Sequence, residues 1–77
     1  MNDKRRKLLN EALRNLEDAE NKISIALDEE EDCLNNLPEN LEGSDRYERM
    51  ENAIANLEDA LSSLDEVKEN VESAILE

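Results

Sequence analysis

Residues 36–45, NLPENLEGSD, contain the only proline and the only glycine of the 77-residue chain. Pro38 disfavours helical backbone at the residue before it, so a helix that enters this stretch should end near its start. Gly43 can take the left-handed backbone of a turn, and Ser44 or Asp45 can cap a new helix. Asp45 and the glutamate three residues later also have the spacing of a capping box. The chain therefore has one place to turn, between two long segments.

Both segments carry apolar residues at spacings of three and four, which is the pattern of one helix face. We expect a first helix over about 3–36, capped by Asn2 or Asp3. A turn over about 37–44 and a second helix over about 45–76 should follow. The whole chain is then a single domain of the all-α class, a two-helix antiparallel hairpin.

Heptad letters describe the apolar stripe on each helix, with Leu9 and Met50 at position a. Large residues fill a and most of e, whereas d holds mainly alanine together with Cys33. Small residues at d should let the two helices approach closely, so we expect Cys33 to be buried. Residues 15–19, NLEDA, recur at 56–60, which indicates either a duplication or the convergence of two amphipathic helices. The residues expected to form the seam are Leu9, Leu13, Leu16, Ile23, Leu27, Leu34, Met50, Ile54, Leu57, Leu61, Leu64 and Val71.

The width of this stripe favours self-association. Three apolar positions in seven are more than one partner helix can cover, and they suit a bundle of four helices. A chain this short also needs a disulfide, a metal or a partner to be stable, and one cysteine without any histidine disfavours the first two. We expect a homodimer or higher oligomer of the four-helix type. The alternative is a monomer whose stripe is reserved for a different protein.

Several function classes are disfavoured by composition. The absence of histidine removes the commonest general base and the usual catalytic triads, and the isolated glycine rules out a phosphate loop. No run approaches the ~20 apolar residues of a membrane span. We therefore expect a cytoplasmic, non-enzymatic protein without cofactor, metal site or membrane contact, and a structural role for the thiol rather than a reactive one.

Acidic residues dominate the charge, with 22 Asp and Glu against nine Lys and Arg. The densest run is Asp28, Glu29, Glu30, Glu31 and Asp32. It is interpreted as a docking patch for a partner with a basic surface, as a solvated and loosened part of the helix, or as a weak divalent-ion site. Direct nucleic-acid binding is disfavoured by net charge and by the lack of stacking aromatics. The acidity can instead imitate the charge of duplex DNA.

A basic cluster opens the chain, formed by Lys4, Arg5, Arg6 and Lys7. Cations are unfavourable at a helix N-terminus, but in an antiparallel hairpin they lie beside the end of the second helix. We expect them to meet the carboxylates of Glu69, Glu72 and Glu77 there. The same four residues are the only candidates for contact with an anionic ligand such as a nucleotide.

The order of these segments supports a loose resemblance to a family. A basic DKRRK start, an acidic helix, the turn segment NLPENLEGSDRYE and a helix with LEDA resemble small proteins encoded by phages and prophages of Gram-positive bacteria. The resemblance spans nearly the whole chain, and residues 36–46 are its most distinctive part. It implies an accessory protein of a mobile element in the host cytoplasm, one that inhibits host defence or modifies host machinery.

Three hypotheses follow. The first is an oligomeric acidic protein that binds and inhibits a host protein, one of defence or nucleic-acid handling, by DNA mimicry or direct blocking. The second is an anti-defence sponge that sequesters an anionic nucleotide signal at an oligomer interface. The third is a structural or assembly component.

Overall fold

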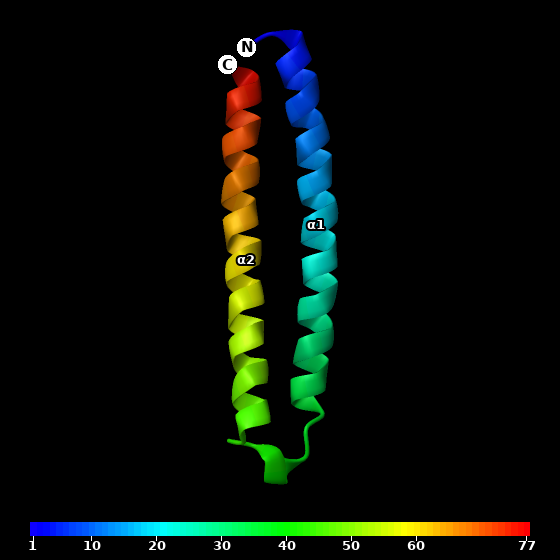
Figure 1. Cartoon of the computed structure of the whole chain (residues 1–77), viewed down its shortest axis with the longest axis vertical. Coiled ribbons are helices and arrows are strands. Elements are labelled where there is room, and N and C mark those ends of the chain that lie inside the picture. The colour runs from blue at the N-terminus through cyan, green and yellow to red at the C-terminus, as the bar shows by residue number, and fades with distance from the viewer.

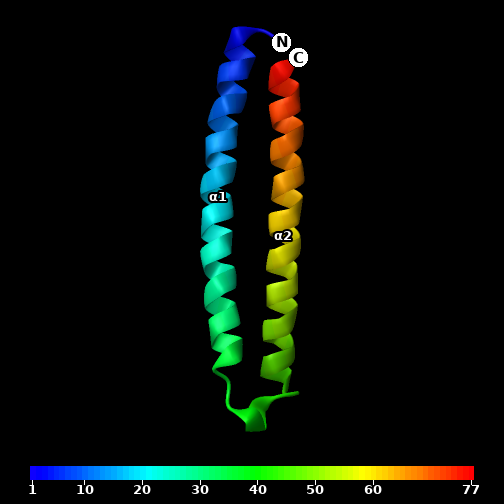
Figure 2. The same cartoon turned by 180° about the vertical axis from the view of Figure 1, so that it is seen from behind.

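The computed structural model describes all residues, 1–77, and contains helices only. Helix α1 spans Asp3–Asn35, the short 3-10 helix η1 spans Glu39–Leu41, and α2 spans Asp45–Leu76. The two long helices run antiparallel and side by side, with both chain ends together at one end of the rod and the turn at the other (Figure 1). The view from behind shows the same arrangement (Figure 2). The predicted all-α helical hairpin is confirmed.

Both long helices begin at a side-chain cap. The Asn2 Oδ1 accepts a hydrogen bond from the Arg5 N–H at 2.9 Å, and the Ser44 Oγ accepts one from the Tyr47 N–H at 3.2 Å. Each cap satisfies one of the amide groups that a helix start leaves without a partner. Of the two predicted caps of the second helix, Ser44 is confirmed. The predicted capping box from Asp45 is wrong, because Asp45 is already helical and Tyr47 follows Ser44 by three residues.

The turn follows from its proline and glycine. Helix α1 ends at Asn35, and Pro38 has extended backbone with φ −59° and ψ 145°. Gly43 has φ +77° and is the only residue in the left-handed region. These two residues reverse the chain between the helices, which places the start of α2 beside the end of α1.

The molecule is a rod of 59 × 15 × 13 Å, too thin to enclose a core. Met50 is its only buried residue, with 8% of its surface exposed. The other eleven predicted seam residues are all partly buried. Two helices in contact along one line cover only one side of each apolar side chain, so the seam leaves part of every leucine open to solvent.

The structure corrects which heptad positions form that line. Every residue at a and e in the two helices is partly or fully buried, whereas d lies at the flank of the seam. At d, Ala26, Cys33 and Val67 are exposed, whereas the other five alanines at this position are partly buried. The expectation of a buried Cys33 is therefore wrong, while most of the alanines at d lie at the edge of the contact between α1 and α2. Large residues at e draw the contact toward themselves, because they offer more apolar area than alanine.

Candidate functional site

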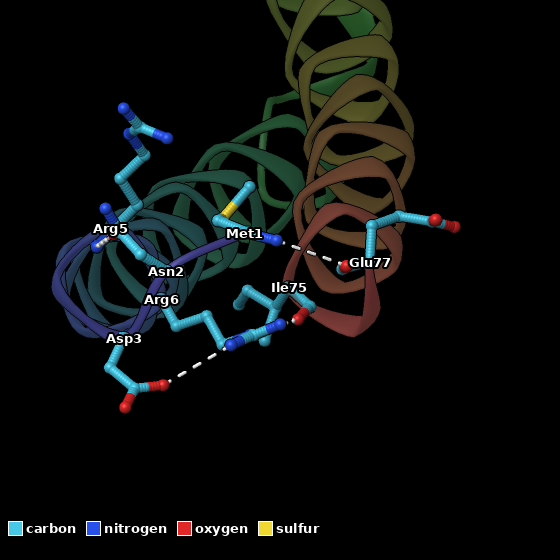
Figure 3. Close-up of polar contacts among 7 residues, drawn as sticks. All are labelled: Met1, Asn2, Asp3, Arg5, Arg6, Ile75 and Glu77. Carbon is cyan, nitrogen blue, oxygen red and sulfur yellow. Dashed lines mark hydrogen bonds and ion pairs between the residues drawn. The ribbon is translucent and has the colours of Figure 1, made fainter.

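The contact through a and e gives the hairpin two different broad faces. In an antiparallel pair, equivalent heptad positions of the two helices lie on the same side. Positions b and f therefore share one face and d and g share the other, while c lies along the outer edges. The end-on view agrees, because Asp3 (b) and Arg6 (e) extend to one side of the helix pair and Arg5 (d) to the other (Figure 3).

The face formed by b and f is called here the acidic face. It has only two cations, Lys7 and Arg14, and the latter lies two turns beyond the former. Because its carboxylates extend along both helices, this face presents negative charge over most of the rod, and its cations lie together near the start of α1. Its acidic residues are Asp3, Glu17, Asp28, Glu31, Glu48, Glu51, Glu58, Asp65, Glu69 and Glu72.

The opposite side, formed by d and g, is called here the apolar face. Most of its side chains are small and uncharged, and it has few acids. Arg5, Arg46 and Arg49 lie near its ends, and Lys22 lies near the middle of α1. Leu8 is 65% exposed and Val67 is 43% exposed on this face. Its residues are Arg5, Leu8, Ala12, Asn15, Ala19, Lys22, Ala26, Glu29 and Cys33 from α1, with Arg46, Arg49, Ala53, Asn56, Ala60, Ser63, Val67, Asn70, Ala74 and the terminal Glu77 from the α2 side.

The acidic run in α1 is not gathered into one patch by the structure. Consecutive helical residues point about 100° apart, so the five acids point around the helix. Asp28 and Glu31 belong to the acidic face, Glu29 to the apolar face and Asp32 to the outer edge. Glu30 occupies an a position and is partly buried at the seam. The acidic face therefore draws its charge from the full length of both helices rather than from this run.

The N-terminal segment contacts the end of α2 at main-chain oxygens rather than at glutamate side chains. The Arg6 Nε donates to the Ile75 carbonyl oxygen at 3.0 Å, and the Met1 amine donates to the Glu77 main-chain oxygen at 3.2 Å (Figure 3). Arg6 also forms an ion pair with Asp3 at 3.3 Å.

The expected ion pairs of this cluster with Glu69, Glu72 and Glu77 are absent. The last carbonyls of a helix lack intrahelical partners and carry partial negative charge, so the Ile75 carbonyl attracts the Arg6 guanidinium without any carboxylate.

An open groove of about 610 Å³ runs beside the start of α1, and Arg6, Lys7 and Arg14 supply its cations. Lys4 and Arg5 do not line it, so only two members of the four-residue basic cluster belong to this groove. Arg14 was not singled out from the sequence, although its spacing of seven from Lys7 indicates a shared face. The groove's remaining lining residues are Asp3, Asn10, Leu13 and Glu17.

One pair of charged side chains, Glu20 and Lys68, bonds across the seam between the helices. The Lys68 Nζ lies 3.0 Å from the Glu20 Oε2, with 19% and 25% of the two side chains exposed, and 3.9 Å from the Asp65 carboxylate. The hydrogen bond from Lys68 lowers the pKa of the Glu20 carboxyl below 4.5, and the same bond raises the pKa of the Lys68 ammonium above 10.5. A single polar pair among leucines favours the register in which its two members meet.

No other side-chain cluster has the geometry of a chemical site. His, Cys, Asp and Glu nowhere form a group that could hold a metal ion. Neither long helix has a stretch apolar enough to cross a bilayer. The two broad faces and the groove are the features available for binding.

Comparison with protein families, with characterised proteins and with solved structures finds no match for this chain.

Proposed function

We propose that this chain is a non-enzymatic, self-associating interaction protein whose acidic face binds the basic surface of a host protein. Its biological setting is that of a mobile-element accessory factor, and its targets are host proteins of defence or of nucleic-acid handling. The observation that carries the proposal is the acidic face, where ten carboxylates oppose two cations along both helices.

The density of charge supports imitation of DNA. A net charge of −13 along 59 Å is about one negative charge per 4.5 Å, and two hairpins side by side approach one per 2.3 Å, against ~1.7 Å for duplex DNA. A protein surface that binds phosphates by charge would accept such a rod. Clefts that focus positive potential would also increase the rate of encounter.

The test is capture of host proteins on the immobilised chain, with and without competing duplex DNA. We expect one protein, or one complex, that duplex DNA displaces. The triple variant Glu51→Gln, Glu58→Gln and Glu72→Gln, which neutralises three b positions, should release it.

The matched control neutralises the same number of carboxylates on the outer edges, with Glu11→Gln, Asp59→Asn and Glu66→Gln. We expect this control to retain the captured protein, because the face is unchanged while the net charge is the same. Equal loss of binding in both triples would refute a face-specific site. Capture of the chain's own copies alone would refute the host-protein target.

The groove at the start of α1 favours a second candidate function, sequestration of an anionic nucleotide. Arg6, Lys7 and Arg14 all line this open groove. Two features count against it, since Asp3 and Glu17 line the same groove and Arg6 already pairs with Asp3. Calorimetric titration with a panel of cyclic and linear nucleotides decides this candidate. Heat with one nucleotide that Arg14→Gln removes would support it, and no heat with any would exclude it.

A further inference from the structure

We propose that the apolar face is covered by a second copy of this chain, so that two hairpins stack face to face in a four-helix bundle with the acidic faces outward. This inference rests on the self-association in the proposed function and specifies its surface. The apolar face lies opposite to the acidic face, so a basic partner bound to the acidic face leaves it free.

The exposed area of the hairpin is the first argument. A folded monomer of 8.8 kDa exposes about 4,800 Å², whereas this chain exposes 5882 Å². The excess of roughly 1,100 Å² is comparable with the ~800 Å² that each partner buries in a stable interface. A second hairpin is thus large enough to bring the exposed area to that of an ordinary folded protein.

Charge distribution selects the face. The acidic face cannot meet a second copy of itself without bringing like charges together. The apolar face has only Glu29 and the terminal Glu77 as acids, against Arg5, Lys22, Arg46 and Arg49. Four cations against two acids leave this face with a small net charge, whereas ten carboxylates against two cations leave the acidic face strongly negative, so a second copy meets less repulsion here.

The side chains of the apolar face are shaped for close packing. Alanine predominates at d, so another pair of helices can approach without steric hindrance, and Val67 with the partly open leucines of the seam supplies apolar area. A homodimer interface is isologous and needs a surface complementary to itself. The offset of 41 residues places alanines at equivalent positions of both helices, Ala12 with Ala53 and Ala19 with Ala60, so both helices of this face present small side chains to a second copy.

The experiment measures the mass of the whole chain in solution by sedimentation equilibrium over a range of concentrations. The test variant is Asn15→Glu with Asn56→Glu, which adds one carboxylate per helix at exposed g positions of the apolar face. The matched control is Asn21→Glu with Ser62→Glu, at exposed f positions of the acidic face. All four sites lie outside the seam, and far-ultraviolet circular dichroism checks that the hairpin is retained.

We expect the unaltered chain to have twice the mass of 8.8 kDa. The test variant should raise the dissociation constant roughly tenfold or more, because its added carboxylates lose water in the interface. The control should change it less than about threefold, through overall charge alone.

A dimer that the control weakens as much as the test variant would overturn the choice of face while leaving self-association intact. A chain that stays at 8.8 kDa at every concentration would overturn self-association itself. Neither result would bear on the acidic face, which the capture experiment tests separately.

Discussion

The two broad faces of the hairpin are made by the same helices but have opposite compositions. The acidic face has a carboxylate at most of its b positions, whereas the apolar face has alanine at most of its d positions. Solvation alone would permit charge on both faces. The difference teaches that the carboxylates are concentrated on one face, and it supports the proposal that the other face contacts a second copy.

The largest change in the free energy of unfolding is expected for a substitution at the seam between α1 and α2. Replacing Met50 with Ala should lower the free energy of unfolding by about 2 kcal/mol, because it removes the one buried side chain. Ile25→Ala on the outer edge, where the side chain is 58% exposed, should change it by less than about 0.5 kcal/mol. Urea unfolding at a fixed protein concentration measures both. Similar losses would contradict the assignment of the seam.

The next largest effect is expected at the start of α2, whose cap fixes where its face positions begin. Ser44→Ala removes the oxygen that accepts from the Tyr47 N–H and should cost about 1 kcal/mol. Ser62→Ala, at an exposed site within α2, should be neutral or slightly stabilising because alanine favours helix. Thermal unfolding of the two variants distinguishes a cap from an ordinary surface serine. An unchanged melting temperature for Ser44→Ala would contradict the cap.

A smaller and pH-dependent effect is expected for the pair between Glu20 and Lys68. The pKa of Glu20 is lowered in the folded state, so the unfolded state binds more protons as pH falls. The stabilisation from this carboxylate is therefore present above about pH 4.5 and is lost as pH falls through the lowered pKa. Glu20→Gln should lower the melting temperature at neutral pH and converge with the unaltered chain in acid. A difference in melting temperature that stays constant from neutral to acid pH would show that protonation of Glu20 is not coupled to folding.

The smallest effect compares two adjacent serines on opposite faces. Ser62→Lys places a cation on the acidic face and should stabilise by a few tenths of a kcal/mol through relief of repulsion. Ser63→Lys places a lysine on the apolar face and should stabilise the fold by a smaller amount. The difference should shrink as salt screens the charges, which urea unfolding at low and high ionic strength measures. Equal gains at low salt would mean that the two faces do not differ in potential.

Local chemistry explains what could be predicted from the sequence. Pro38 and Gly43 act on the backbone next to them, so the turn and both helices follow from neighbouring residues. The seam residues could be predicted for the same reason, since apolar spacing marks a helix face wherever that face packs.

The choice of face could not be predicted in this way. On each helix, position e on one side of position a holds mostly large residues, and position d on the other side holds mostly small ones. The heptad pattern alone does not say which of these two sides packs against the other helix. Glu20 and Lys68 place polar side chains at e, and they meet each other across the seam. The prediction of a buried Cys33 is wrong for the same reason, because it assumed that position d faces the other helix. The acidic run from Asp28 to Asp32 is continuous in the sequence, but successive residues of a helix point in different directions, so its carboxylates do not form one patch.

The reactivity of a single thiol tests most directly whether the two faces have different roles. Cys33 is exposed on the apolar face of the hairpin, so its rate of reaction with a thiol reagent reports whether that face is covered. The comparison chain exchanges two residues, with Cys33→Ser and Ser62→Cys, and carries its thiol on the acidic face. We expect the rate at Cys33 to fall as protein concentration rises through the range of dimer formation, while the rate at the acidic-face thiol stays constant. A concentration-independent rate at Cys33 together with protection of the acidic-face thiol would contradict the assignment of the faces.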